Sequence, residues 1–216
     1  QISTWGESDF SLDVNASWES KEELHSVFKL FWPNSIKKTY NYTFFDYGTY
    51  QRYTYNDVDL FLLDAMTFRK ENKSTLYGDK QMERLFQEMK NTGATFTVIA
   101  SPSPFTFDTE DAFLHYKEQF NYFLYRLDMS DINGLILISA GEELVETRFH
   151  KYIFNPTSDI KKHIYEFNFP SISMNNYSLV NVSGKSGDRI LSFETYNENG
   201  NLLYRKILHQ NDLKLN

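Results

Sequence analysis

Cysteine is absent from this chain of 216 residues, and several other features that define common protein classes are missing too. Without cysteine the chain forms neither disulfides nor thiolate metal sites, and its composition does not indicate whether the protein lies in a reducing or an oxidising compartment. No apolar run approaches the roughly 18–20 residues that span a bilayer, and no signal peptide is recognisable. The net charge is −7 and no basic run of five residues occurs, which argues against a nucleic acid as partner.

Motifs of two large hydrolase classes are also missing. Ser101 and Ser103 follow an apolar segment, but no G-x-S-x-G elbow surrounds either serine. The histidines show no H-x-H, H-x-x-H or H-E-x-x-H spacing, which leaves them as scattered residues rather than zinc ligands. They are His25, His115, His150, His163 and His209. No glycine-rich phosphate loop is present either.

The segment around which the chain is organised is DVDLFLLDAMTFR, residues 57–69. Its unbroken apolar run, Leu60–Leu63, is typical of a strand that is covered on both faces. Asp64 and Arg69 follow this strand, so we expect them at its carboxyl tip, beside the ends of Phe96–Ser101 and Leu135–Ser139. We interpret Asp64 and Arg69 as an ion pair that braces the tip, with a phosphate grip as the alternative.

The first two thirds of the chain alternate between helical and strand patterns. A short β-prone start over Ile2–Asn15 precedes a helix that a Ser20–Glu23 capping box opens and that ends near Phe31. An antiparallel pair, Tyr40–Asp46 with Thr49–Tyr55, leads into the central strand. Further helices are predicted over Asp79–Asn91, with Met82, Leu85, Phe86 and Met89 facing inward, and over Thr109–Asp128.

After Gly141 the pattern changes to alternating segments that indicate antiparallel strands. These are Val145–Phe154, His163–Phe169, Arg189–Tyr196 and Leu202–His209, and the last two form a hairpin around Asn197–Gly200. The sequence therefore predicts an α/β fold: a mixed sheet with its helices on one face, in a single domain. Within residues 1–216, the α/β part takes residues 1–144 and the antiparallel part residues 145–216.

Six segments occur in the order found in a known family. They are TWGESDF (Thr4–Phe10), FWPNS (Phe31–Ser35), LDAMTFR (Leu63–Arg69), LYGDKQ (Leu76–Gln81), IASPSPF (Ile99–Phe105) and LISAGEELVE (Leu137–Glu146). Together they resemble the C-terminal portion of the PhoD-like (alkaline phosphatase D) metallophosphoesterases. The resemblance implies one half of an αββα sandwich, a two-metal phosphate site holding ions such as Ca, Fe or Zn, and an exported protein.

The chain departs from that family where the metals bind. Of the family's W-D-D-H-D motif only the last acid remains, as Asp9, and Ser8 replaces the histidine. Gly141 and Glu143 stand where the family's G-D-x-H motif has its aspartate and its histidine. Met66 replaces the first arginine of D-x-R-x-x-R, and the family's N-terminal half has no counterpart here. Because a two-metal centre needs those carboxylates and imidazoles, we expect no bound cofactor.

An acidic cluster remains as a possible substitute for the lost ligands. Glu7, Asp9, Glu142, Glu143 and Glu146 offer carboxylate oxygens, which a hard cation such as Ca²⁺ accepts without imidazole. The alternative is a solvated acidic turn.

Three functions follow from these observations. The first is a catalytically inactive relative that acts as a binding or scaffolding subunit of an extracytoplasmic complex. Aromatic residues in predicted loops, Tyr47, Tyr50, Tyr53 and Phe105–Phe107, then supply a protein interface. The second is part of a metal-dependent phosphatase or phosphodiesterase, completed by a missing N-terminal half or by a partner chain. The third is a module that binds Ca²⁺ or a glycan.

Overall fold

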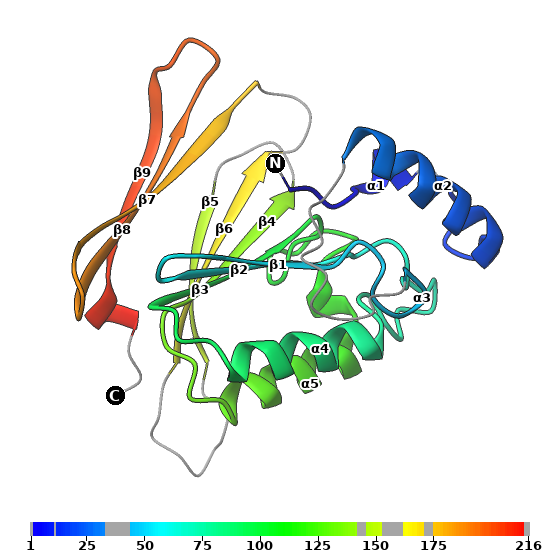
Figure 1. Ribbon diagram of the computed structural model, residues 1–216, viewed down its shortest axis with the longest axis horizontal. Helices are drawn as coiled ribbons and strands as arrows, with labels where there is room; N and C mark the ends of the chain where they lie inside the picture. The colour runs from blue at the N-terminus through cyan, green and yellow to red at the C-terminus, as the bar shows by residue number, and fades with distance from the viewer. Residues whose placement is uncertain are drawn as a thin grey trace.

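The computed structural model describes residues 2–10, 12–32, 44–141, 146–152, 162–170 and 175–213. Its strands form two sheets, one with six strands in the order β1-β2-β3-β4-β6-β5 and one with three strands in the order β7-β8-β9 (Figure 1). The larger sheet comprises β1 (Gln51–Tyr55), β2 (Val58–Leu62), β3 (Phe96–Ser101), β4 (Leu135–Gly141), β5 (Glu146–Tyr152) and β6 (Lys162–Pro170). β2, β3, β4 and β6 are mutually parallel, whereas β1 and β5 pair antiparallel at the edges.

The helices cover one face of the six-stranded sheet. They are α1 (Glu7–Phe10), α2 (Trp18–Phe31), α3 (Phe44–Tyr47), α4 (Asp79–Lys90) and α5 (Lys117–Asp128), with a short 3-10 helix, η1 (Phe113–His115), before α5. Successive strand residues point to opposite faces. Accordingly, Ile99 of β3 packs in a core with residues of α1, α2, α4 and α5, whereas its neighbour Val98 belongs to a second core.

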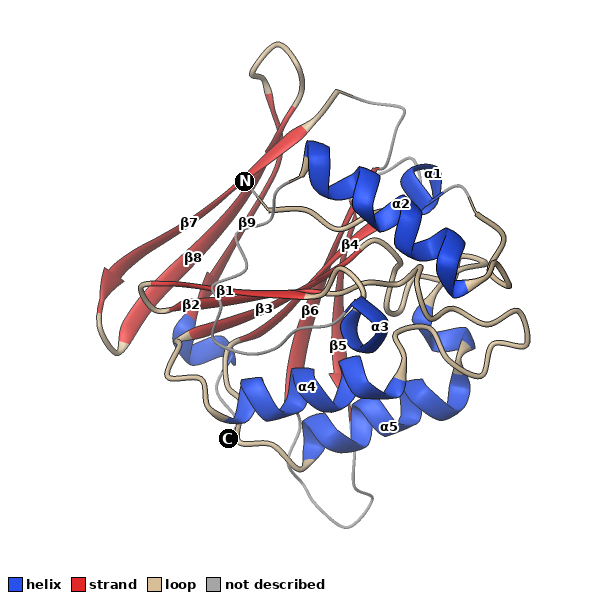
Figure 2. Cartoon of the chain, turned by 45° about the vertical axis from the view of Figure 1, so that its right-hand side comes forward, coloured by secondary structure: helices blue, strands red, loops and turns tan. Residues whose placement is uncertain are grey.

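The second core lies between the two sheets. β7 (Tyr177–Lys185), β8 (Asp188–Tyr196) and β9 (Leu202–His209) form the smaller sheet, and the 3-10 helix η2 (Gln210–Leu213) follows. Phe193 of β8 stacks on Phe167 of β6 with ring centroids 4.3 Å apart. Arg189 forms an ion pair of 2.6 Å with Asp57 in the β1–β2 turn. Figure 2 shows the resulting arrangement, with helices on one side of the larger sheet and the smaller sheet on the other. The predicted fold class, a mixed sheet with helices on one face, is confirmed.

The N-terminal predictions need correction. The predicted β-prone start contains α1 and no strand in its described residues. The predicted capping box is wrong by one turn, because the N-cap of α2 is Ser17, whose hydroxyl accepts a hydrogen bond from the Ser20 amide at 3.2 Å. The helix ends at Phe31 as predicted, but Phe31 is 73% exposed, whereas Phe28 of the same predicted face is buried.

The predicted antiparallel pair is also wrong. Phe44–Tyr47 is the short helix α3, and residues 40–43 lie outside the described part of the chain. β1 instead pairs with β2 across the turn at Asn56 and Asp57. Asn56 has φ of 51°, and a left-handed asparagine at this point is typical of tight two-residue hairpin turns.

The two later helices follow the sequence closely. α4 occupies the predicted range, and its predicted inward side chains, Met82, Leu85, Phe86 and Met89, are all buried. The prediction over Thr109–Asp128 is too long, since Tyr116, with φ of −89° and ψ of 64°, interrupts the helical backbone between η1 and α5.

The C-terminal strands were only partly predicted. The hairpin of β8 and β9 is confirmed. β6 pairs antiparallel with β5, as the prediction for residues 145–216 implies, but it is parallel to β4 on its other side. β5 and β6 also belong to the larger sheet, and β7 was not predicted. Whether residues 1–216 form one domain stays a prediction.

Candidate functional site

The carboxyl ends of β2, β3 and β4 meet at one edge of the larger sheet, as the sequence predicted. In the parallel register, Leu62 lies beside Ala100, and Ser101 beside Ser139. Asp64 and Arg69 come from the loop after β2, and Ser103 and Asp111 from the loop after β3. We call Asp64, Arg69, Ser101, Ser103 and Asp111 the strand-tip site.

Asp64 is completely buried, and both of its carboxylate oxygens accept hydrogen bonds from the surrounding chain. Oδ1 accepts from the amides of Met66 and Thr67 at 2.8 and 2.9 Å. Oδ2 accepts from the Thr49 amide at 2.8 Å and from the hydroxyls of Thr49 and Thr67 at 3.1 and 2.6 Å. With five donors around it, this carboxylate shapes the loop rather than facing a ligand.

Two further residues fix Asp64 in place. A Cβ atom on Gly48 would come within 2.1 Å of Asp64 Oδ2, and Gly48 has φ of +58°, so glycine is required on both grounds. Gln81 of α4 accepts from the Asp64 amide at 2.8 Å and donates to its carbonyl at 2.9 Å. The family-like segments LDAMTFR and LYGDKQ therefore meet through a structural brace.

A buried lysine lies behind the same loop. Lys21 is 5% exposed, and its Nζ donates to the carbonyls of Val14 and Thr67 at 3.2 and 2.9 Å. Burial, and then the charge of Lys70, lower the pKa of Lys21, whereas the charges of Asp64 and Asp13 raise it. Lys21 thus adds a positive charge near the Asp64 carboxylate without contacting it.

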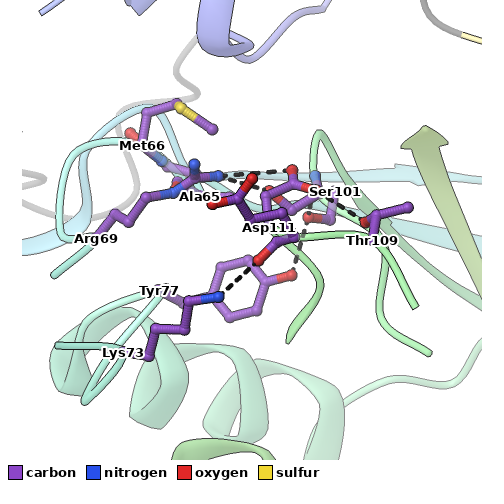
Figure 3. A network of polar contacts seen from close by, with 11 residues as sticks. Ala65, Met66, Arg69, Lys73, Tyr77, Ser101, Thr109 and Asp111 are labelled. Carbon is purple, nitrogen blue, oxygen red and sulfur yellow. Dashed lines mark hydrogen bonds and ion pairs between the residues drawn. The ribbon is translucent and has the colours of Figure 1, made fainter. Parts of the chain in front are cut away.

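Arg69 does not pair with Asp64, so that interpretation is wrong. Its Nη2 atom donates to Ser103 Oγ at 2.9 Å and lies 3.7 Å from Asp111 Oδ2, and its Nε atom donates to the Ala65 carbonyl at 3.2 Å (Figure 3). Asp111 in turn accepts from the Thr109 hydroxyl at 2.9 Å. The guanidinium therefore ties the loop after β2 to the loop after β3, with its charge met by a carboxylate.

Ser101 and Tyr77 form the inner part of the site. Their hydroxyl oxygens are 2.9 Å apart, and Ser101 Oγ also accepts from the Ser103 amide at 3.0 Å. Tyr77 is fully buried, and this burial raises its pKa far above the usual value, although the hydrogen bond with Ser101 works in the opposite direction. A phenol that keeps its proton cannot act as a base toward Ser101 at neutral pH, so this pair does not provide a nucleophile.

A second buried carboxylate, on β6, accepts hydrogen bonds from the loop after β3. Glu166 of β6 accepts from the amides of Phe105 and Thr106 at 2.8 and 2.9 Å and from the Ser139 hydroxyl at 2.7 Å. The Thr106 hydroxyl also donates to it. Since Glu166 is fully buried and bonded on both oxygens, it too serves the loop.

Asp9, the remaining acid of the Trp5 motif, has a local role. Its Oδ2 accepts from the Gly6 amide at 3.0 Å at the start of α1, and the residue is exposed. Trp5 is completely buried and contacts Phe10, with ring centroids 5.2 Å apart. Thr4 donates to the Leu63 carbonyl at 3.1 Å, so this segment lies next to the end of β2.

The other predicted acidic positions are only partly described. Gly141 is the last residue of β4 and pairs with Pro170 of β6. Glu142 and Glu143 lie outside the described residues. Glu146 begins β5 opposite Asn168, and its side chain is not described. The calcium cluster therefore stays a prediction.

The described side chains do not fit a two-metal centre. Such a centre needs several carboxylates or imidazoles with free lone pairs converging on each ion. In the described part of the chain, no three His, Cys, Asp or Glu side chains come together as a set that can hold a metal ion. Asp64 and Glu166, the two buried acids at this edge, have both oxygens engaged by hydrogen-bond donors.

Sequence reasoning missed the donors that surround Asp64. Thr49 and Thr67 gave no motif, and Gln81 was noted only as the end of LYGDKQ. A glutamine directly before the apolar stripe of α4 is a signal that points to a buried amide, and Gln81 is completely buried. The predicted aromatic interface is wrong for Tyr50, Phe105 and Phe107, which are 4%, 0% and 6% exposed and belong to the interior.

The described residues form a mixed α/β fold, with helices on one face of the six-stranded sheet and the smaller sheet on the other. No protein-family model and no curated protein matches the sequence. Among solved structures, the chain is similar to one described as "Structure of PhoD", with a TM-score of 0.62 and 14% identity. The match covers 96% of this chain and 51% of that one, so the chain spans about half the length of the PhoD structure. The similarity shows a PhoD-like fold.

No described helix has the length and apolar composition needed to cross a membrane.

Proposed function

We propose that this chain is a PhoD-like relative without phosphatase activity and that it acts as a binding or scaffolding subunit of an extracytoplasmic protein complex. The observation that carries the proposal is the use of Asp64 and Arg69, the family-like charged positions, as structural braces. Asp64 accepts hydrogen bonds from five donors, and Arg69 is paired with Asp111, so both side chains hold the loops in place. Neither side chain is then available to bind a metal ion or a phosphate group.

The chemistry of phosphoryl transfer supports this reading. Metal ions activate the attacking hydroxide and neutralise charge on the phosphate, and they require ligands with free lone pairs. The sequence has Ser8 where the family has a histidine and Gly141 where it has an aspartate. The hydrogen bonds between Asp64 and Gln81 still hold the loop after β2 against α4. A chain that keeps its fold without the metal ligands is suited to binding rather than to catalysis.

A second candidate function follows from the extent of the similarity. Because the chain spans about half of the PhoD structure, it suits one part of a metal-dependent phosphatase or phosphodiesterase whose other ligands come from a second half or a partner chain. In that case Arg69 faces substrate phosphate only after the loops rearrange, since Ser103 and Asp111 now hold it.

The test is hydrolysis by the purified chain. We expect no release of nitrophenol from p-nitrophenyl phosphate or bis(p-nitrophenyl) phosphate above the buffer rate with added Ca²⁺, Fe³⁺ or Zn²⁺. A rate that a chelator abolishes and that Arg69→Ala lowers would overturn the proposal. Cell fractionation checks the extracytoplasmic location.

A further inference from the structure

β7 is an open edge of the smaller sheet. In the strand order β7-β8-β9 it pairs with β8 on one side, and among the described residues no segment pairs with its other side. Figure 2 shows β7 at the outer rim of this sheet, on the side away from α4 and α5. The backbone N–H and C=O groups along such an edge form a template for a further strand.

β7 lacks the features that normally prevent strands from pairing. Natural edge strands carry charged residues, proline or bulges that block the addition of another strand. β7 (YSLVNVSGK) has no proline and no charge before Lys185. The other described sheet edges do carry charges: β9 has Arg205 and Lys206, β1 has Arg52, and β5 reads ETRFHKY. β7 is therefore the described edge that is most open to strand addition.

Exposed apolar side chains lie on both faces of β7. Val180 pairs with Phe193, which lies in the core between the sheets, so Val180 is on the inner face, yet it is 44% exposed. Leu179 pairs with Glu194 on the outer face and is 47% exposed. A strand that pairs with β7 continues both faces of the sheet and covers part of each side chain.

The sequence of β7 is complementary to a second copy of itself in antiparallel register. With Asn181 on a two-fold axis, Val180 lies opposite Val182 of the second copy, and both valines are on the inner face. On the outer face, Leu179 lies opposite Ser183 of the second copy. Because residues 177–184 carry no charge, no like charges oppose each other along this pairing.

The charges at the two ends of β7 favour the same register. Lys185 is exposed at the carboxyl end of the strand. At the other end, Glu198 accepts a hydrogen bond from Asn175 at 2.9 Å, so its carboxylate lies beside the segment that leads into β7. Antiparallel pairing about Asn181 brings Lys185 of each copy to residue 177 of the other and thus toward Glu198. Parallel pairing in register instead sets Lys185 beside Lys185.

We propose that two copies of this chain associate by pairing their β7 strands antiparallel about a two-fold axis at Asn181. The pairing joins the two smaller sheets in the order β9-β8-β7-β7-β8-β9, and it closes because both copies use the same edge. The net charge of −7 per copy is screened beyond about 8 Å at physiological ionic strength, whereas β7 itself carries Lys185 alone. The inference goes beyond the proposed function and holds whether or not the chain hydrolyses phosphate.

The absence of cysteine allows a direct test of the register, because a single introduced cysteine has no competitor. Residues directly opposite each other in an antiparallel pair have Cα atoms about 4.5–5.5 Å apart, which a disulfide spans. A residue meets its own counterpart only on the two-fold axis, so Asn181→Cys should form a cross-linked dimer on mild oxidation. Tyr125→Cys, at a 59% exposed position of α5, is the matched control and should stay monomeric in a denaturing gel.

Sedimentation equilibrium of the full chain measures the association without a cross-link. We expect twice the mass of one chain, with a dissociation constant that Tyr125→Lys leaves unchanged. Asn181→Lys sets two like charges opposite each other at an exposed position and should weaken the dimer at least about tenfold. Lys185→Glu should also weaken it, and the further change Glu198→Lys should restore it, since opposite charges then meet again.

Four results would overturn the inference. The first two are a chain that sediments as a monomer throughout a dilution series and a dimer that Asn181→Lys leaves intact. The others are cross-linking from position 181 that is no faster than from position 125, and a Lys185→Glu dimer that Glu198→Lys does not restore. Hydrolysis is measured separately, so failure of the proposed function and failure of this interface are distinguishable outcomes.

Discussion

Asp64 is the residue on which the strand-tip site depends most. Its position after an apolar strand suggested an ion pair or a phosphate grip, and in the structure it accepts five hydrogen bonds within a closed loop. A carboxylate that is saturated in this way determines the conformation of the local backbone.

Replacing Asp64 by asparagine should therefore destabilise the protein. Asp64→Asn replaces one acceptor oxygen by an amide group that donates. If Oδ2 is replaced, the buried donors of Thr49 and the Thr67 hydroxyl lose their acceptor, and if Oδ1 is replaced, the amides of Met66 and Thr67 lose theirs. Either loss should cost about 2–3 kcal/mol of stability. Urea unfolding measures the change. Asp9→Asn, at an exposed carboxylate, is the control and should lie within about 0.5 kcal/mol of the wild type. Equal stability of the two variants would contradict the assigned role of Asp64.

Gly48 gives a second test at the same place. In Gly48→Ala the Cβ atom meets Asp64 Oδ2 at 2.1 Å and the backbone keeps φ of +58°. Gly187 has φ of +86° with open space around it, so Gly187→Ala isolates the conformational penalty of about 1–2 kcal/mol. We expect Gly48→Ala to be clearly more destabilising in thermal unfolding or to fail to fold. Similar melting temperatures would mean that the close approach does not exist.

At the scale of elements, His25 connects α2 to its surroundings. Its ring stacks on Phe44 of α3 with centroids 4.1 Å apart and meets the edge of Trp5 at 5.8 Å. Burial, and then the charge of Lys29, lower the pKa of His25 to about 4, against a smaller opposing effect of Asp64. The neutral ring thus suits the aromatic packing between these elements.

The contribution of His25 to stability should depend on pH. Because the folded pKa lies below the unfolded value of about 6.5, the contribution is complete above pH 6.5 and is lost as pH falls toward 4. At pH 5 the loss should be about 1 kcal/mol after allowance for partial solvent exposure. His25→Phe should remove this part of the pH dependence in chemical denaturation. An unchanged difference between pH 7 and pH 5 would contradict the prediction.

The elements that the sequence predicted well are those with a local, strong signal. α4 has a continuous apolar stripe, and β2, β3 and β4 are short apolar runs with polar ends, so periodicity and length determine them. The direction of β6 depends on which strand lies beside it, and its own alternation carries no such information. Tyr40–Asp46 was interpreted as a strand because of its aromatic alternation, yet Phe44–Tyr47 is a helical turn whose Phe44 packs on His25.

The candidate site was predictable in location but not in function. Residues 64, 69 and 101 meet at one edge because parallel strands end together. Thr67 lies in the same turn as Asp64, but Thr49 and Gln81 are distant in the sequence, and no local pattern connects them with Asp64. Arg69 pairs with Asp111 and not with Asp64, because folding brings the loop that carries Ser103 and Asp111 next to the loop that carries Arg69.

At the scale of the whole molecule, the chain has three layers: helices, the six-stranded sheet and the smaller sheet. One face of the smaller sheet completes the core between the two sheets, whereas Leu179 and Val180 of β7 are exposed. The buried acids at the strand tips, Asp64 and Glu166, are both engaged by hydrogen-bond donors within the chain. The proposed function therefore depends on the surface of the fold and requires no reactive side chain.

The metal content of the purified full chain tests this account most directly. Elemental mass spectrometry after extensive dialysis against metal-free buffer should find near-zero iron and zinc, because the oxygens of Asp64 and Glu166 are already engaged by hydrogen-bond donors. One or two equivalents of a metal, lost together with hydrolysis in the presence of a chelator, would contradict the account and restore the phosphatase interpretation.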